Sequence, residues 1–218
     1  MNRYNRAFYE LSCADAVLET VGPLHNRGKE ISESMSLLAR MRYGLLKRPY
    51  TVFDLCAGNG LTGTLAAFLF PKAEVVALDV RVPARDWGAI HRFRYVEGDV
   101  RRIDAAFLRG LCRGRAIFAA VHPCTELAES VIDLFNASPF ADWLFLMPCC
   151  VGDIDPQAVP PPIADTLGPH MAWNYHLYHR IKASYRTIQV DEDNLSARNA
   201  VITGSRVGRR GERLDNAG

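Results

Sequence analysis

The sequence lacks any apolar run approaching the roughly 20 consecutive residues that a membrane-spanning helix needs. Its first residues carry Arg3, Arg6 and Glu10, where a secretory signal would have an apolar segment. No internal repeat is found, and the composition is ordinary for a globular domain. We therefore expect a cytoplasmic protein without a membrane partner, whose six cysteines are reduced thiols.

Strong net charge is also missing. The formal charge of +2 over 218 residues neither favours nor excludes nucleic acid as a partner. The arginines are scattered, apart from a run near the end that comprises Arg206, Arg209, Arg210 and Arg213. Because glycines interrupt this run, we expect residues 207–218 to form a flexible basic tail rather than a nucleic-acid-binding arm.

Several catalytic motifs are absent as well. The chain has no G-x-S-x-G turn of serine hydrolases, no H-E-x-x-H zinc motif and no Walker loop. Function must therefore be sought in the order of strands and helices, and in the side chains where the strands end.

Near-continuous apolar segments at 51–56, 74–80, 93–100, 116–122 and 143–150 are each expected to be strands followed by a helix. Such runs are typical of a parallel sheet buried on both faces. Two further strands, at 185–191 and 199–205, are joined by a short turn and should be antiparallel neighbours. The expected fold class is α/β: a Rossmann-like, mostly parallel seven-stranded sheet with a C-terminal antiparallel hairpin and helices on both faces.

Other segments surround this sheet. Helices over 4–21 and 30–46 each carry an apolar face, so we expect residues 1–48 to pack on or cap the site of a domain spanning 49–206. The Pro-rich segment 156–169 is long for a loop and predicts a substrate lid. The next helix is expected at 171–183, with Trp173, Leu177 and Ile181 packed on the sheet.

The stretch "FDLCAGNGLTG" spans 53–63, and its Gly58, Gly60 and Gly63 satisfy the dinucleotide pattern G-x-G-x-x-G. Between a strand and a helix, such a turn brings backbone N–H groups close to a ligand. The pattern alone is weak, because a plain tight turn also uses glycines.

Acidic residues near the strand ends add information. Asp54 lies in an apolar strand, and a carboxylate there would repel a pyrophosphate but tolerate S-adenosylmethionine, which carries an ammonium and a sulfonium. Asp79 ends the second strand, where it can accept hydrogen bonds from ribose hydroxyls. Asp99 ends the third, where it can accept from an adenine amino group. Each aspartate alone could be a turn or cap residue, but together they predict one adenosine cofactor crevice.

Two other functions remain open at this point. The literal glycine pattern and Asp79 suit an NAD(P)-dependent oxidoreductase, whereas Asp54, Asp99 and the closing hairpin count against it. A cofactor-binding partner protein without catalysis is also compatible, because methyl transfer leaves no obligatory catalytic residue to find missing.

The segment "DLCAGNG" resembles the first motif of class I S-adenosylmethionine-dependent methyltransferases, with Cys56 where many members have glycine. "VHPCTELAE" and "FLMPCCVG" resemble a generic methyltransferase-domain subgroup that is distantly similar to 2′-O-ribose tRNA methyltransferases. The resemblance spans about residues 26–205 and implies transfer of a methyl group to a small molecule or RNA. "KEISES" resembles a segment of that group and implies that Lys29 and Glu30 lie near the cofactor. The expected cofactor-binding residues are Asp54, Cys56, Gly58, Asn59, Gly60, Asp79, Val80, Asp99 and Val100.

Strand four ends in "HPCTE", without the N-P-P-[YFW] signature of many amino-group nucleic-acid methyltransferases. His122 and Cys124 are the candidate catalytic residues, because they leave that strand where an acceptor would lie. A zinc site made from His122, Cys124, Cys149 and Cys150 is not expected, since the adjacent Cys149 and Cys150 would point to opposite faces of an extended strand unless the chain bends. A third possibility is structural: at least one of Cys149 and Cys150 is buried in the core as a small hydrophobic residue.

Overall fold

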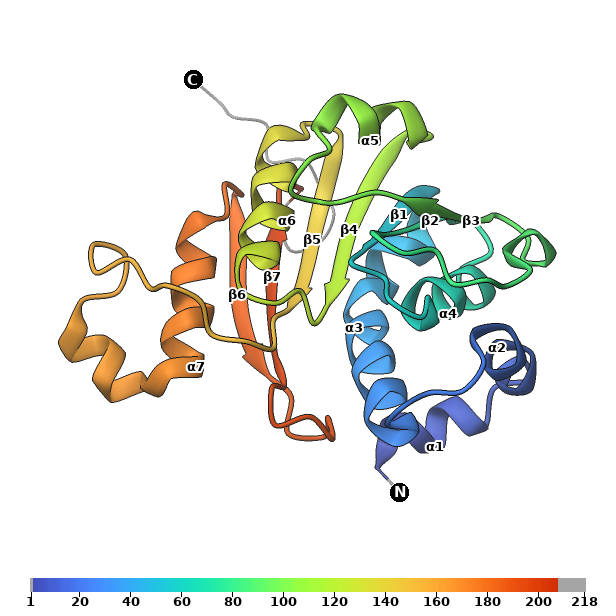
Figure 1. The fold of residues 1–218 in the computed structure, drawn as a ribbon, viewed down its shortest axis with the longest axis horizontal. Coiled ribbons are helices and arrows are strands. Elements are labelled where there is room, and N and C mark those ends of the chain that lie inside the picture. Colours follow the sequence, from blue (N-terminus) through green and yellow to red (C-terminus); the bar gives the residue numbers. More distant parts are fainter. Residues whose placement is uncertain (1, 208–218) are drawn as a thin grey trace.

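The structure is a computed structural model that describes residues 2–207, without the side chains of residues 43, 44, 46 and 47. Over this range the chain forms a seven-stranded sheet at the centre of the molecule, with helices on both faces (Figure 1). The strands are β1 Tyr50–Leu55, β2 Glu74–Asp79, β3 Phe93–Glu97, β4 Arg115–Val121, β5 Ala141–Met147, β6 Tyr185–Val190 and β7 Ala200–Ser205.

The strand order is β3-β2-β1-β4-β5-β7-β6. The first five strands run parallel, and β7 inserts antiparallel between β5 and β6. Every residue of β1 and of β5 is buried, as expected for strands covered on both faces. This is the Rossmann-like topology of the class I methyltransferase fold, so the predicted fold class is confirmed.

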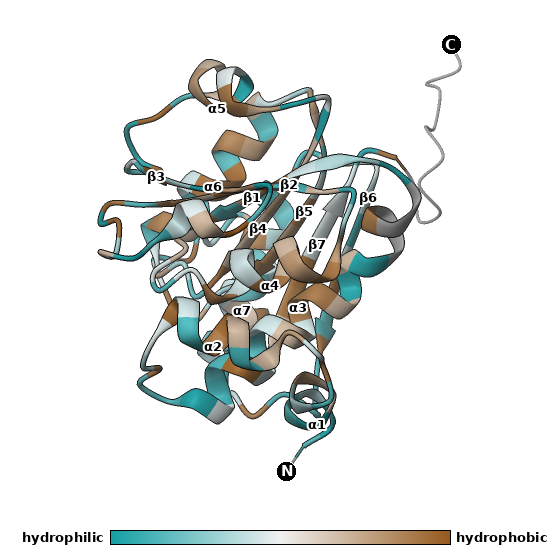
Figure 2. Ribbon diagram, turned by 90° about the vertical axis from the view of Figure 1, so that its right-hand side faces the viewer, coloured by the Kyte–Doolittle hydropathy of each residue, from teal (hydrophilic) through white to brown (hydrophobic). Residues whose placement is uncertain are grey.

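The helices form two layers, each with its own core. One layer packs α1 Arg3–Tyr9, α2 Ala14–Val21, α3 Arg27–Lys47 and α4 Leu61–Leu69 on the sheet. The other packs α5 Ala105–Leu111, α6 Glu126–Ala137 and α7 Pro161–Arg180. The expectation of a helix after every parallel strand is wrong between β2 and β3, where the chain forms only the 3-10 turn η1 Trp87–Ala89. Figure 2 shows hydrophobic residues along the strands and on the helices that cover them. No helix within residues 2–207 has the length and apolar character needed to cross a membrane.

The single helix expected over 4–21 is wrong: two short helices replace it. α1 ends at Tyr9, and α2 begins only at Ala14. In between, Leu11 donates to the carbonyl of Phe8 at 3.0 Å, a tighter turn than an α-helix makes. The intervening Ser12 and Cys13 are poor helix formers, which allows the break.

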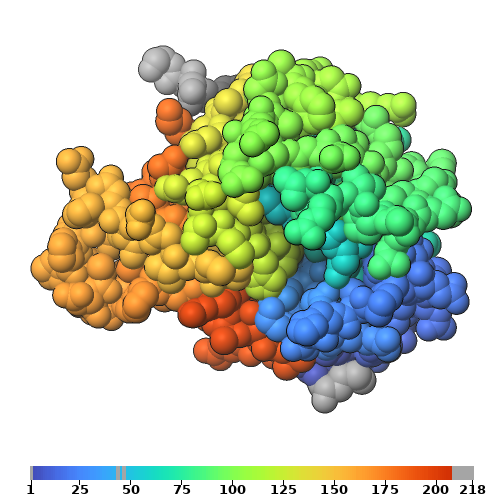
Figure 3. Space-filling view, viewed as in Figure 1, coloured from blue at the N-terminus to red at the C-terminus, as the bar shows by residue number. Residues whose placement is uncertain are grey.

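The Pro-rich segment also differs from the expectation, because its second half is helical. Pro161 stands in the first turn of α7, where a missing N–H costs nothing. Gly168 adopts φ 73° just before Pro169, and this kink divides the helix. Beyond the kink, Trp173, Leu177 and Ile181 are buried as predicted. Figure 3 shows the first half of α7 standing out from the body of the molecule.

The basic run near the end is not all tail. The Arg206 guanidinium donates to the carbonyl of Phe135 at 2.7 Å and lies over that residue's ring at 4.4 Å. It therefore satisfies a carbonyl at the C-terminus of α6, where a cation is favoured. The tail expected over 207–218 is wrong at its first residue, because Val207 is buried in the core and its N–H donates to Ser205 Oγ at 3.2 Å. The rest of that tail, with Arg209, Arg210 and Arg213, lies outside the described residues.

Candidate functional site

A cavity of about 300 Å³ opens at the carboxyl ends of β1 and β4. Its walls are the N-terminal part of α3, the loop after β1, the start of α4 and the end of β4. Strand order reverses between β1 and β4, and open α/β sheets bind ligands at such a switch point. The cavity is therefore where the sequence predicts a cofactor, and Cys56, Gly58, Asn59 and His122 line it.

Alternate residues of the loop after β1 have left-handed backbone. Cys56, Gly58 and Gly60 have φ values of 60°, 56° and 79°. This conformation costs a residue with a Cβ about 1–2 kcal/mol, which explains the glycines at 58 and 60. Cys56 adopts it in spite of this cost. Gly63 is needed for a different reason: a Cβ there would lie 3.0 Å from Asp54 Oδ2.

We expect Gly60→Ala to lower the free energy of unfolding by about 2 kcal/mol, since a Cβ at φ 79° would also lie 2.9 Å from Trp87 Cη2. Gly110→Ala is the matched control, because no atom within 4 Å meets its Cβ and alanine favours a helix by about 1 kcal/mol. Denaturant unfolding measures both. Equal effects of the two substitutions would contradict this view of the loop.

The three predicted aspartates lie around this loop but make different contacts. Asp79 Oδ2 accepts a hydrogen bond from the Gly58 N–H at 2.9 Å. The buried Asp54 Oδ2 accepts from the Gly63 N–H at 2.8 Å, at the start of α4. Asp99 pairs with Arg101 at 2.8 Å, and Arg101 also reaches Glu126 of α6. Any ligand of Asp99 must therefore share this carboxylate with Arg101.

All three aspartates affect the pKa of one neighbouring thiol, that of Cys56. Burial, followed by Asp79, Asp54 and Asp99, raises the pKa of Cys56 to about 12. Burial raises the pKa of Asp54 to about 7, although the Gly63 N–H partly opposes it. Burial is the main cause of both shifts, and the neighbouring carboxylates add a negative potential that suits a cationic ligand. Of the two predicted valines, Val80 is exposed beside Asp79, whereas Val100 is buried in the core.

Sequence reasoning missed Glu33, which lines the cavity. Its side chain is 1% exposed, and its Oε1 lies 2.5 Å from His122 Nε2 and 2.9 Å from Lys29 Nζ. Burial disfavours the charged form, but His122, Lys29 and Ser196 outweigh it and lower the pKa of Glu33. The Lys29 to Glu33 spacing of four residues on a helix was the available signal.

Because the pKa of Glu33 is lowered, its carboxylate stabilises the folded state above the ordinary pKa of 4.5, and this contribution is lost as the pH falls through the folded-state value. We expect the free energy of unfolding to decline below about pH 4.5, and to decline less steeply in Glu33→Gln. Unfolding titrations across this range measure the difference. An identical slope for the variant and the parent chain would contradict the assignment.

The neighbouring Glu30 ties the same helix to the loop. Its Oε2 accepts from Asn59 Nδ2 at 2.6 Å, and its Oε1 accepts from the Asn26 N–H at 2.9 Å. Asn59 Oδ1 in turn accepts from the Leu61 N–H at 3.0 Å. Glu30 thus lies beside the predicted cofactor loop, whereas the Lys29 side chain contacts Glu33 and His122.

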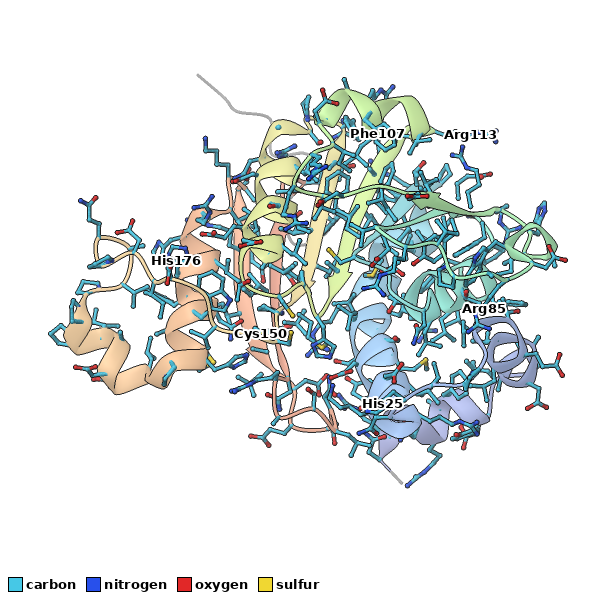
Figure 4. All side chains as sticks on the ribbon, viewed as in Figure 1. His25, Arg85, Phe107, Arg113, Cys150 and His176 are labelled. Carbon is cyan, nitrogen blue, oxygen red and sulfur yellow. The ribbon has the colours of Figure 1, made fainter. Side chains whose placement is uncertain are left out.

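His122 and Cys124, the two candidate catalytic residues, face different surroundings. His122 has φ 59°, and its ring contacts Glu33 and Lys29 at the cavity. Cys124 Sγ instead lies 3.1 Å from Cys149 Sγ and 3.3 Å from Cys150 Sγ. The chain has left β5 at Met147, so the bend occurs and both adjacent thiols converge rather than diverge. Figure 4 shows Cys150 at the ends of β4 and β5.

The hairpin between β6 and β7 also reaches this region. Asn199 Nδ2 donates to the Asp191 carbonyl at 2.9 Å and holds the hairpin together. Ser32 Oγ donates to Asn194 Oδ1 at 3.3 Å, which fixes the hairpin tip against α3. Ser196 is consequently close enough to hydrogen-bond Glu33, a contact across more than 160 positions of sequence that no local pattern indicates.

No protein-family model matches the sequence, and neither does any curated protein. Among solved structures, the antibiotic-resistance methyltransferase Kmr is similar with a TM-score of 0.46 and 17% identity, over 79% of this chain and 91% of that one. A SAM-dependent methyltransferase from Aquifex aeolicus has a TM-score of 0.49 and 14% identity, over 87% and 95%. A mutant 16S rRNA (adenine(1408)-N(1))-methyltransferase from Catenulisporales acidiphilia with the cosubstrate SAM has a TM-score of 0.43 and 15% identity, over 78% and 90%.

Proposed function

We propose that the chain is an S-adenosylmethionine-dependent methyltransferase whose cofactor lies in the cavity at the ends of β1 and β4. The observation that carries this proposal is the left-handed loop, tied to Asp79 through the Gly58 N–H at 2.9 Å and surrounded by carboxylates. A dinucleotide would bring its anionic pyrophosphate to this loop, whereas S-adenosylmethionine brings no phosphate. Nothing in the comparisons supports the oxidoreductase alternative.

The residues present fit this cofactor. Asp79 would accept hydrogen bonds from the ribose, beside the exposed Val80. Glu30 and Glu33 offer carboxylates to the ammonium of the methionine part, and Lys29 offers a cation to its carboxylate. When bound, the cofactor supplies an electrophilic methyl group, and transfer then depends mainly on how the chain aligns the acceptor.

His122 would accept the acceptor's proton. Two groups compete for His122 Nε2: the Glu33 carboxylate at 2.5 Å, which favours hydrogen on Nε2, and Lys29 Nζ at 3.3 Å, which can only donate. The Glu33 contact is shorter, and Lys29 can donate to Glu33 at 2.9 Å instead, so the favoured tautomer has hydrogen on Nε2 and the lone pair on Nδ1. The Nδ1 atom of His122 is buried, and it has no hydrogen-bond partner within residues 2–207. A buried, unpartnered nitrogen is costly, and a bound molecule would offset this cost by donating to it.

We expect His122→Asn to lower methyl transfer by about 100-fold or more while S-adenosylhomocysteine still binds, since asparagine tolerates φ 59° but is no base. Transfer from tritiated S-adenosylmethionine and calorimetric binding measure the two effects. His179→Asn, at an exposed position of α7, is the control and should keep full transfer. Undiminished transfer by His122→Asn would remove the base assignment.

The function is tested by incubating the chain with tritiated S-adenosylmethionine and fractionated extract, with and without ribonuclease. The proposal predicts label in at least one fraction. Ribonuclease-sensitive label would identify RNA as the acceptor, and label in a small-molecule fraction would identify the other class. Binding of S-adenosylhomocysteine without any labelled product would contradict catalysis and favour a cofactor-binding partner protein.

A further inference from the structure

We propose that Cys124, Cys149 and Cys150 form a three-thiolate site for one Zn²⁺ ion, with a fourth coordination position left open. Among the residues that the structure describes, their sulfur atoms form a group of candidate ligands that all lie within 4.8 Å of one another. Thiolates are the ligands that select zinc over harder cations. The proposal does not depend on methyl transfer, because it concerns metal binding alone.

The sulfur triangle has nearly the size that zinc requires. The three Sγ–Sγ distances are 3.1, 3.3 and 3.4 Å. Zinc–sulfur bonds of about 2.3 Å in a tetrahedron place sulfurs about 3.8 Å apart, so each pair must open by less than about 1 Å. A disulfide needs about 2.05 Å and would use only two of the three thiols. Convergence of all three therefore favours an ion over a disulfide.

The fold fixes this triangle from two neighbouring strands. β4 and β5 are in parallel register up to Val121 and Met147, and the His122 N–H donates to the Met147 carbonyl at 2.8 Å. The thiols of Cys124 and Cys149 both lie 3.7 Å from the carbonyl of His122. Two of the three ligands are thus positioned by a backbone carbonyl at the ends of two strands, and Cys150 follows directly after one of them.

Exposure gives the ion a path and leaves one position free. Cys124 and Cys149 are half-buried, whereas Cys150 is exposed. The ring of His122 does not join the group, because its Nε2 lies against Glu33. Three protein ligands with a solvent-facing fourth position is the arrangement of zinc sites that bind a further molecule, rather than of closed structural sites. Each thiol would release its proton to solvent as its bond to the ion forms.

The test titrates the full, reduced chain with Co²⁺ in the absence of air, then with Zn²⁺. We expect one equivalent of Co²⁺ to produce thiolate-to-cobalt charge-transfer absorption, and Zn²⁺ to abolish it. Cys150→Ser should weaken Co²⁺ binding by at least about tenfold, and its exposed position lets the variant fold. Cys112→Ser is the matched control, because that free cysteine follows α5 and lies outside the group.

Absence of the charge-transfer absorption, or full retention of it in Cys150→Ser, would overturn the proposal. Elemental analysis of the chain as purified adds a second readout, with one zinc per chain expected. The metal assignment is wrong if the chain holds no zinc and mass spectrometry finds two of the three thiols joined as a disulfide. The site would then be a pair of redox-active cysteines, with the third cysteine taking no part.

Discussion

Asp79→Ala is expected to weaken binding of S-adenosylhomocysteine by about 100-fold or more. Its carboxylate holds the Gly58 N–H at 2.9 Å and, under the proposed function, also accepts from the ribose. Hydrogen bonds to a charged group contribute about 1.5–3 kcal/mol each. The Gly58 bond exists with and without the ligand, so the effect on affinity comes from losing the bonds that the ribose hydroxyls would donate to this carboxylate, and two such bonds account for an effect of this size. Isothermal titration calorimetry measures the change directly.

Glu97→Ala is the matched control for Asp79. Glu97 lies opposite Asp79 in the β2–β3 register and is exposed, so its removal takes away a nearby negative charge without touching the loop. We expect its affinity to equal that of the parent chain. Equal losses in the two variants would mean that net charge, and not the contact with Gly58 and the ligand, governs binding.

Asp54→Asn is expected to stabilise the ligand-free chain at about pH 8, by about 1–3 kcal/mol. Burial raises the pKa of Asp54 to about 7 from an ordinary 3.8. Between these values the unfolded chain ionises first, so the carboxyl costs the folded state increasing free energy as the pH rises. Asparagine avoids this cost and can still accept from the Gly63 N–H.

The gain should vanish toward about pH 4, where the aspartate is largely protonated in the folded state. It should also be accompanied by weaker S-adenosylhomocysteine binding, since an asparagine cannot supply negative charge to the loop. Urea unfolding at the two pH values measures the first effect. The exposed Asp153→Asn is the control, and a pH-independent difference for Asp54→Asn would contradict the buried-carboxyl interpretation.

Much of the fold could be predicted because the strands are buried on both faces. The apolar runs at 51–56, 74–80 and 116–122 became β1, β2 and β4 within one residue at each end. The break between α1 and α2 could not be predicted, because Leu11 and Ala14 keep the helical spacing across it. The start of α7 was missed since prolines usually indicate loops, although they suit the first turn of a helix.

Only those site residues that are close together in the sequence could be predicted. The loop of Cys56, Gly58 and Gly60 was recognisable from its spacing and lies at the cavity. Glu33 was not, because its partners His122 and Ser196 come from distant elements that only the folded sheet brings together. Sequence reasoning rejects a metal site at the three thiols because Cys149 and Cys150 are expected to alternate as in a strand, but alternation applies inside a strand and Cys149 lies beyond the end of β5.

The central claim is that the cavity between β1 and β4 binds a phosphate-free adenosine donor. Calorimetric titration of the full chain with S-adenosylhomocysteine, and separately with NAD, tests it most directly. The account predicts saturable binding of S-adenosylhomocysteine at one site per chain, lost in Asp79→Ala, and no binding of NAD. Saturable NAD binding with no heat from S-adenosylhomocysteine would contradict it.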